Sequence, residues 1–142
     1  MPLQSRAQQR QAEGPTGVAA TVLVVEDEEL MRELLRMHLS NAGYEVLVAE
    51  DAVVAGRLVL RRRPDLILAD IEMPFMNGLE FVELLKSDDS LSTIPVIFVS
   101  SRADLEDRCK QLGAAAFLKK PVLSDPLLAA VAKHVQGGRI PL

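Results

Sequence analysis

The sequence predicts an α/β protein built on a doubly wound, five-stranded parallel sheet. From Thr21 onward, five short apolar runs rich in β-branched residues alternate with longer amphipathic stretches, which is typical of repeated strand-helix units. The first of these runs is apolar throughout, as expected for a strand covered by helices on both faces. A chain of 142 residues is long enough to form one such domain with its own core.

We expect one folded unit, residues 21–136, between two irregular segments. Residues 1–20 are rich in Gln, Ala, Gly and Pro and have no apolar period, so we expect a flexible tail. Residues 137–142 show no pattern and would form a C-terminal tail. If the domain belongs to a longer protein, Gly137-Gly138 would begin a linker.

Five strands are predicted, each followed by a helix. The strands are expected at residues 22–25, 46–49, 66–69, 96–99 and 116–118. The first helix is expected over residues 30–42, where polar residues recur at spacings of three and four, and Gly43 stops it. The opposite stripe of this helix should face the core. Its residues are Leu30, Met31, Leu34 and Leu35.

Residues that start or stop helices delimit the other four. Pro64 ends the helix over residues 52–62, and a turn-forming Asn77-Gly78 pair precedes the helix over residues 79–86. Gly113 follows a helix whose core side is Leu105, Cys109 and Leu112. Asp125 and Pro126 provide the N-cap and first position of the last helix. Its inward residues are expected to be Leu128, Val131, Ala132 and Val135.

Composition excludes several classes of protein. The net charge is −4 and no block of basic residues occurs, which argues against direct binding to nucleic acid. No run approaches the roughly 18 apolar residues of a membrane span, and the first 17 residues lack the apolar centre of a signal peptide. We therefore expect a cytoplasmic protein without a membrane partner. The single cysteine, Cys109, is expected to be a small buried hydrophobe.

Polar side chains follow the ends of four predicted strands. Glu26 and Asp27 follow the first strand, Asp70 the third, Ser100 the fourth and Lys120 the fifth. Because the carboxyl ends of parallel strands meet on one rim of the sheet, we expect these side chains to converge there.

Converging carboxylates need a cation. At about 4 Å and an effective dielectric of about 20, each carboxylate pair repels by roughly 4 kcal/mol. An all-oxygen set without His or Cys suits Mg²⁺. The ammonium of Lys120 and the hydroxyl of Ser100 would complete a site for a phosphoryl group. Asp70 stands alone at the end of the central strand, so it is the best placed nucleophile for forming an acyl phosphate.

This ordered set of motifs resembles the receiver domains of bacterial two-component response regulators. The motifs are Glu26-Asp27 after the first strand, Asp70 followed by Met73-Pro74 and Asn77-Gly78, Ser100 after an apolar strand, and Lys120-Pro121. The resemblance covers about residues 21–136. It implies a flavodoxin-like fold with strand order 2-1-3-4-5, and a signalling switch that catalyses only its own phosphorylation and dephosphorylation.

The resemblance also implies roles for single residues. Asp70 would be the phosphoacceptor of the phosphorelay, and it would hold Mg²⁺ together with Glu26, Asp27 and the backbone carbonyl of Glu72. Ser100 and Lys120 would bind the phosphoryl group.

Four further positions match functional positions of the family. Phe117 would be the switch aromatic, and the bond that joins Lys120 to Pro121 would be cis. Glu72 and Arg102 occupy the positions that tune dephosphorylation, and we expect Glu72 to disfavour an attacking water by its charge and Arg102 to pair with Glu72.

The implied partners are proteins. A histidine kinase or a histidine phosphotransfer protein would supply the phosphoryl group. A downstream protein target would bind the surface formed by the fourth helix, fifth strand and fifth helix, through which a homodimer could also form. No effector domain follows the fifth helix in this sequence, so we expect output to pass through contact with another protein.

Two other classes share parts of the pattern. Phosphatases of the haloacid-dehalogenase type also use an Asp nucleophile with Mg²⁺, but their nucleophile lies on the first core strand, and this chain is too short for a substrate-capping insertion. Flavodoxin-like electron carriers share the layout, but no Ser-, Thr- and Gly-containing phosphate loop follows the first strand and Trp is absent.

Overall fold

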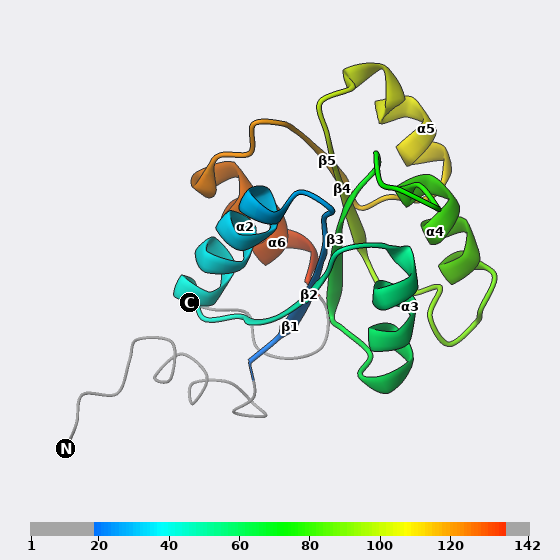
Figure 1. The fold of residues 1–142 in the computed structure, drawn as a ribbon, viewed down its shortest axis with the longest axis horizontal. Helices are drawn as coiled ribbons and strands as arrows, with labels where there is room; N and C mark the ends of the chain where they lie inside the picture. The colour runs from blue at the N-terminus through cyan, green and yellow to red at the C-terminus, as the bar shows by residue number, and fades with distance from the viewer. Residues whose placement is uncertain (1–18, 136–142) are drawn as a thin grey trace.

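A five-stranded parallel sheet forms the middle layer of the molecule, in the order β2-β1-β3-β4-β5 (Figure 1). The computed structural model describes residues 19–135. The predicted fold class and strand order are confirmed. Most of the expected N-terminal tail and the whole expected C-terminal tail lie outside the described residues. Ala19 and Ala20, which we placed in the first tail, are buried against the sheet.

Each strand is one residue longer than predicted. The strands are β1 (Thr21–Val25), β2 (Glu45–Ala49), β3 (Leu66–Asp70), β4 (Val96–Ser100) and β5 (Ala116–Lys119). The three central strands β1, β3 and β4 are buried along their whole length, because helices cover both faces of the sheet. Val25 pairs with Ala69, so the carboxyl ends of β1 and β3 lie side by side.

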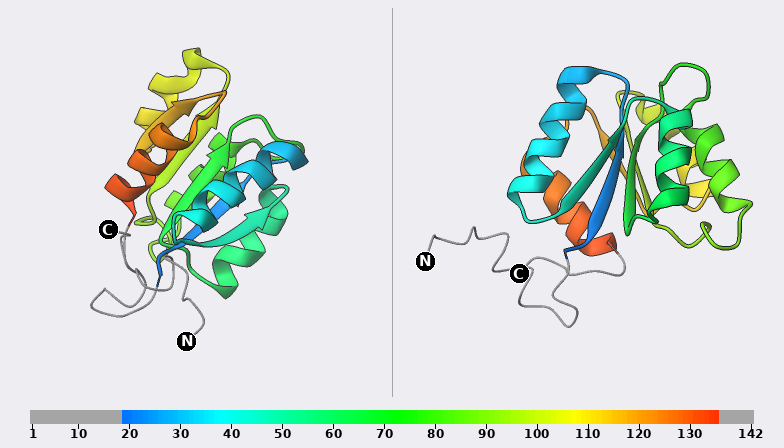
Figure 2. Two further views of the ribbon diagram at one scale, coloured as in Figure 1. Left: turned by 90° about the vertical axis from the view of Figure 1, so that its left-hand side faces the viewer. Right: turned by 60° about the horizontal axis from the view of Figure 1, so that its bottom comes forward.

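Helices cover the sheet on both faces (Figure 2). They are α2 (Glu29–Asn41), α3 (Ala52–Arg61), α4 (Gly78–Lys86), α5 (Glu106–Gln111) and α6 (Ser124–His134), with a short 3-10 turn, η1 (Ala103–Leu105), before α5. One core lies between the sheet and α3, α4 and α5, and it includes Cys109, buried as predicted. The other core lies between the sheet and α2 and α6. None of the helices within residues 19–135 is long and apolar enough to cross a bilayer.

The inward face of α2 differs from the prediction. Leu35 and Leu39 are buried, whereas Leu30 is 80% exposed and Leu34 is 42% exposed. Leu35 and Leu39 are four residues apart and therefore lie on one stripe of the helix, which packs on the sheet. Leu30 and Leu34 belong to the neighbouring stripe, so their prediction as core residues was wrong.

The start of α6 also differs. The helix begins at Ser124 with Leu123 at the N-cap, so Asp125 is not the cap and Pro126 stands third in the helix. Proline is tolerated there because the first N–H groups of a helix have no intrahelical acceptor. With this start, Leu127 rather than Leu128 is the fully buried residue beside Val131.

Candidate functional site

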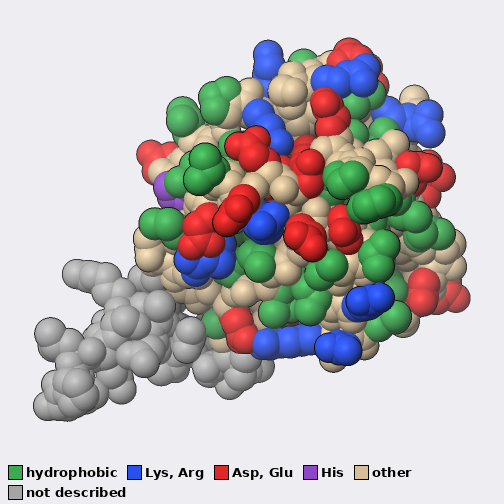
Figure 3. All heavy atoms as spheres, viewed as in Figure 1, with side chains coloured by type: hydrophobic (Ala, Val, Ile, Leu, Met, Phe, Trp, Pro, Cys, Tyr) green, Lys and Arg blue, Asp and Glu red, His purple; other side chains and the backbone are tan. Residues whose placement is uncertain are grey.

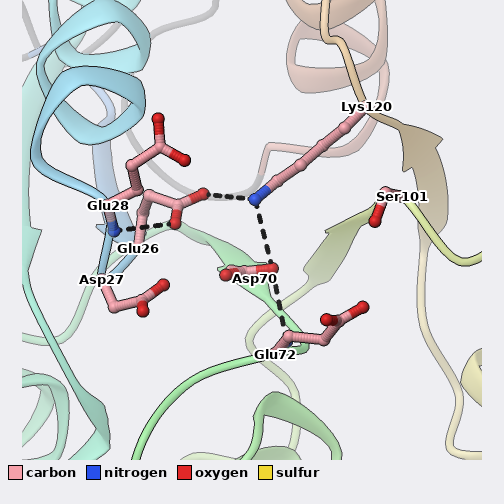
Figure 4. Close-up of a pocket in the computed structure, with 7 residues that line it drawn as sticks. All are labelled: Glu26, Asp27, Glu28, Asp70, Glu72, Ser101 and Lys120. Atoms are coloured by element: carbon pink, nitrogen blue, oxygen red, sulfur yellow. Dashed lines mark hydrogen bonds and ion pairs between the residues drawn. The ribbon is translucent and has the colours of Figure 1, made fainter.

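A pocket of about 380 Å³ opens where β1, β3, β4 and β5 end (Figure 4). The side chains that line it are Glu26, Asp27, Glu28, Asp70, Glu72, Ser101 and Lys120. The structure therefore brings together both carboxylates that follow β1, the one that ends β3 and the lysine that follows β5. Convergence at the carboxyl ends of the strands is the arrangement that the strand topology predicts.

The β1 end places one carboxylate inside the protein and one outside. The amide of Glu26 donates to the carbonyl of Ala49 at 3.0 Å, which continues the ladder past β1 and buries the Glu26 side chain. Asp27, the next residue, points to solvent. A guanidinium nitrogen of Arg32, in the first turns of α2, donates to the carbonyl oxygens of Glu26 at 2.9 Å and Asp27 at 3.3 Å. The loop between β1 and α2 is thereby fixed.

Asp70 is the last residue of β3 and is buried. Its Oδ1 accepts a hydrogen bond of 3.3 Å from the amide of Glu72. The backbone at Asp70 is packed directly against Gly78, the first residue of α4, since a Cβ built on Gly78 would lie 2.2 Å from the Asp70 carbonyl oxygen. The amide of Gly78 donates to the carbonyl of Ile71 at 2.8 Å. Only glycine leaves room for this closure of the loop.

Lys120 reaches across the pocket to two buried carboxylates (Figure 4). Its Nζ lies 2.9 Å from Glu26 Oε1 and 3.4 Å from Asp70 Oδ1. The backbone amide of Lys120 donates to the carbonyl of Ser100 at 2.9 Å, which ties the end of β5 to the end of β4. The peptide bond that joins Lys120 to Pro121, for which we expected the cis isomer, is cis.

The electrostatics follow from this crowding. Burial, and after it the charge of the neighbouring Glu26, raise the pKa of Asp70 to about 7, although the charge of Lys120 opposes the shift. Burial would lower the pKa of Lys120, but its close contact with Glu26 and the charge of Asp70 outweigh burial, so the net shift is upward. The ammonium therefore stays charged between two carboxylates.

The donor set fits a divalent metal ion. One carboxylate oxygen each from Glu26, Asp27 and Asp70 lies within 4.8 Å of the others. When all three are ionised, a single ammonium leaves two negative charges uncompensated. Oε1 of Glu26 is buried without a hydrogen bond of good geometry to any described residue, and the ion pair with Lys120 is its contact. An all-oxygen group with one open side suits a hard cation such as Mg²⁺, which keeps part of its water.

The structure separates the two serines after β4. Ser100 ends the strand at the rim but is buried, and its hydroxyl oxygen accepts a hydrogen bond of 3.0 Å from the amide of Arg102. Ser101 lines the pocket instead. Neither Ser101 nor Glu28 was predicted to be a pocket residue. Their direct adjacency to the assigned residues at strand ends was the available signal.

The expected pair between Arg102 and Glu72 was wrong. The guanidinium of Arg102 binds Asp104 through two hydrogen bonds, of 2.8 and 3.3 Å. Asp104 is two residues away on the turn η1, so this contact forms with little loss of chain entropy. Glu72 remains exposed at the pocket.

Phe117 lies outside the pocket. Its ring is partly buried and packs on the core beneath α5. Phe117 also borders a groove of about 180 Å³ between β5 and α6, with Pro121, Leu123 and Pro126 among the other residues of that groove. Phe117 therefore contacts both the core and this groove.

Comparison with known proteins agrees with this geometry. The family model described as the response regulator receiver domain matches residues 22–132. The chain belongs to this family. The receiver is 41% identical over 104 residues to the polar-differentiation response regulator DivK of Brucella anthropi, an alignment that covers 72% of this chain and 85% of that protein.

Two further similar proteins differ from each other in how much of their own length this chain matches. The phosphate regulon transcriptional regulatory protein PhoB of Pseudomonas aeruginosa is 34% identical over 114 residues, which is 79% of this receiver and 50% of PhoB. The structure of the Vibrio cholerae chemotaxis protein CheY4 superposes with a TM-score of 0.78 at 29% identity, covering 82% of this chain and 99% of CheY4. The receiver is thus a signalling domain of two-component systems.

The contact at Gly78 predicts that substitution by alanine changes stability differently at two glycines. Gly78→Ala should lower the free energy of unfolding by about 1–3 kcal/mol, since the added methyl overlaps the backbone of Asp70. Gly56→Ala in α3, where nothing lies within 4 Å of the added atom, should leave stability unchanged or raise it by about 0.5–1 kcal/mol. Urea unfolding of both variants measures this, and equal effects would contradict the close packing.

The pKa of Asp70 predicts how stability depends on pH. Between its ordinary value of 3.8 and about 7, folded protein holds a proton on Asp70 that the unfolded chain has released, so this residue makes the metal-free protein less stable as pH rises through that window. Asp70→Asn should therefore raise the melting temperature more at pH 8 than at pH 5, measured in a chelator. Asp89→Asn, at an exposed site, is the control. A gain for Asp70→Asn that does not depend on pH would refute the assignment.

Proposed function

We propose that this receiver accepts a phosphoryl group on Asp70 in a Mg²⁺-dependent reaction and that the change alters the surface of α5, β5 and α6 for a partner protein. The observation that carries the proposal is the position of Asp70. Its buried carboxylate lies beside the ammonium of Lys120 and within the cluster of carboxylate oxygens. The donor would be a histidine kinase or a histidine phosphotransfer protein, and the location would be the cytoplasm expected from the sequence.

The transfer is a substitution at phosphorus. An Oδ atom of Asp70 attacks the phosphoryl group, the bond between phosphorus and the donor's imidazole nitrogen breaks, and the imidazole leaves with that electron pair. Glu26, Asp27, Asp70 and the backbone carbonyl of Glu72 would hold Mg²⁺. When bound, the ion supplies charge stabilisation for the phosphoryl oxygens.

The residues of the chain hold and orient the group. Lys120 already lies 3.4 Å from Asp70 Oδ1, so its ammonium can pair with a phosphoryl oxygen on that residue. The hydroxyl of Ser100 uses its oxygen as an acceptor for the Arg102 amide, which leaves its hydrogen available for donation toward Asp70. The hydroxyl of Ser101 lines the same pocket and is a second candidate donor.

Phosphorylation would act on neighbouring strands through charge. A carboxylate becomes a group near −2 with additional acceptor oxygens, which attracts Lys120 and the Ser100 hydroxyl. The backbone bond from Lys120 to Ser100 ties these two strand ends together, so they would move as a unit. Phe117 is three residues before Lys120 on β5, and its half-buried ring would turn inward into the space that Ser100 vacates. The groove between β5 and α6 would change shape with it.

Mass measurement tests the chemistry. We expect wild type incubated with Mg²⁺ and acetyl phosphate to gain one phosphoryl group, detected by intact mass spectrometry, while Asp70→Asn gains none. Asp88→Asn, an exposed change remote from the pocket, should be modified like wild type. Equal modification of Asp70→Asn, or full modification of wild type in the presence of a chelator, would refute the proposal.

Glu72 should lengthen the life of the acyl phosphate. Its carboxylate is exposed at the pocket mouth, where negative charge disfavours approach of a nucleophilic water. We expect Glu72→Asn to shorten the lifetime, measured by loss of the phosphorylated mass after the donor is removed. Arg102→Ala should change it less, since the guanidinium of Arg102 is paired with Asp104. An unchanged lifetime in Glu72→Asn would exclude this role.

A further inference from the structure

We infer that the groove between α3 and α4 is a surface through which two copies of this receiver pair around a two-fold axis. The groove has a volume of about 250 Å³ and an almost wholly apolar lining. Val53, Gly56 and Leu60 line it from α3, and Phe81 and Leu84 line it from α4. α3 and α4 lie side by side on one face of the sheet (Figure 1). None of the residues of the phosphoryl pocket takes part, so the inference does not depend on the proposed function.

The apolar side chains of this groove are unusually open to solvent. Leu60 is 77% exposed, Leu84 56% and Val53 54%. Gly56 lies between Val53 and Leu60 on the same stripe of α3 and has no heavy atom within 4 Å of its missing Cβ, which makes a notch in the helix surface. The exposed Leu60 of one copy could therefore fill the notch at Gly56 of an identical copy.

Charge indicates that the occupant is a second copy. α3 contains Arg57 and Arg61 and no acidic residue, and the side chain of neither arginine has a hydrogen bond or ion pair with any residue from 19 to 135. The exposed surface of α4 and the turn that follows carries Glu80, Glu83 and Asp88, and Glu83 also lies 3.6 Å from the guanidinium of Arg108 on α5. The outer flank of α3 is therefore basic, and the exposed surface of α4 carries more acidic than basic groups. Figure 3 shows basic side chains beside hydrophobic ones along the lower edge of the molecule.

Helix geometry places the apolar contact residues and the arginines of α3 on adjacent stripes of that helix. Arg57 and Arg61 each follow one position after a groove residue, Gly56 and Leu60, and so lie on the flank of α3 that faces away from α4. When α3 of a second copy lies in the groove, its Leu60 enters the notch at Gly56. Its arginine flank then passes over the acidic surface of α4. A two-fold axis makes the same contacts twice, which is the commonest way in which identical chains pair.

A different surface makes a matched control. The groove between β5 and α6 also has an exposed leucine, Leu123, and lies elsewhere on the molecule. Leu60→Glu and Leu123→Glu are the same change at two exposed sites, and neither should prevent folding.

Sedimentation velocity of the full chain over a concentration series tests the inference. Wild type should shift toward dimer mass as concentration rises, Leu60→Glu should weaken the dimer at least about tenfold, a loss of about 1.4 kcal/mol, and Leu123→Glu should match wild type. Dimerisation lost in Leu123→Glu and kept in Leu60→Glu would overturn the inference in favour of the β5 side. A wild type that remains monomeric at about 1 mM, the weak limit of specific association, would overturn it outright.

Charge reversal gives a second, independent readout. The chain with Arg57→Glu and Arg61→Glu should be monomeric, and so should the chain with Glu83→Arg and Asp88→Arg, which keeps the capping contacts of Glu80. A mixture of the two should form a heterodimer, because each reversed helix then meets a reversed partner. Failure of the mixture to associate, when both chains are folded by circular dichroism, would exclude the pairing of α3 with α4.

Discussion

Two buried carboxylates that share one ammonium at the end of a parallel sheet are the constraint on which this molecule depends. The pairing of Val25 with Ala69 brings the ends of β1 and β3 together, and so forces Glu26 and Asp70 into one small volume. Lys120 relieves only part of their repulsion. The remaining negative charge makes the pocket a place for a cation, and a cation beside a nucleophilic carboxylate makes it a place for phosphoryl chemistry.

The division of the surface follows from the same layout. The charged pocket occupies the rim of the sheet, the groove next to Phe117 lies between β5 and α6, and the apolar groove lies between α3 and α4. Receiving a signal, presenting it and pairing with a second copy would therefore use separate parts of one small domain.

The sequence predicted the strands well because continuous runs of Val, Ile and Leu between turn residues have few other interpretations. It predicted the pocket because parallel topology sends every strand end to the same rim. It misjudged the facing of α2, since the polar spacing allows two adjacent stripes and only contact with the sheet selects the one that holds Leu39. The partner of Arg102 was missed because a local turn brings Asp104 closer to it than Glu72. The close contact at Gly78 was also missed, because the Asn-Gly pair predicts a turn but does not show that the backbone of Asp70 packs against it.

That absence of a side chain at Gly78 has a mechanical consequence. Because Gly78 has no Cβ, the carbonyl oxygen of Asp70 lies directly against the backbone of the first turn of α4. A displacement of the strand end would press on the first turn of α4, and α4 forms one wall of the apolar groove. The width of that groove would then report the chemical state of a residue that it never touches.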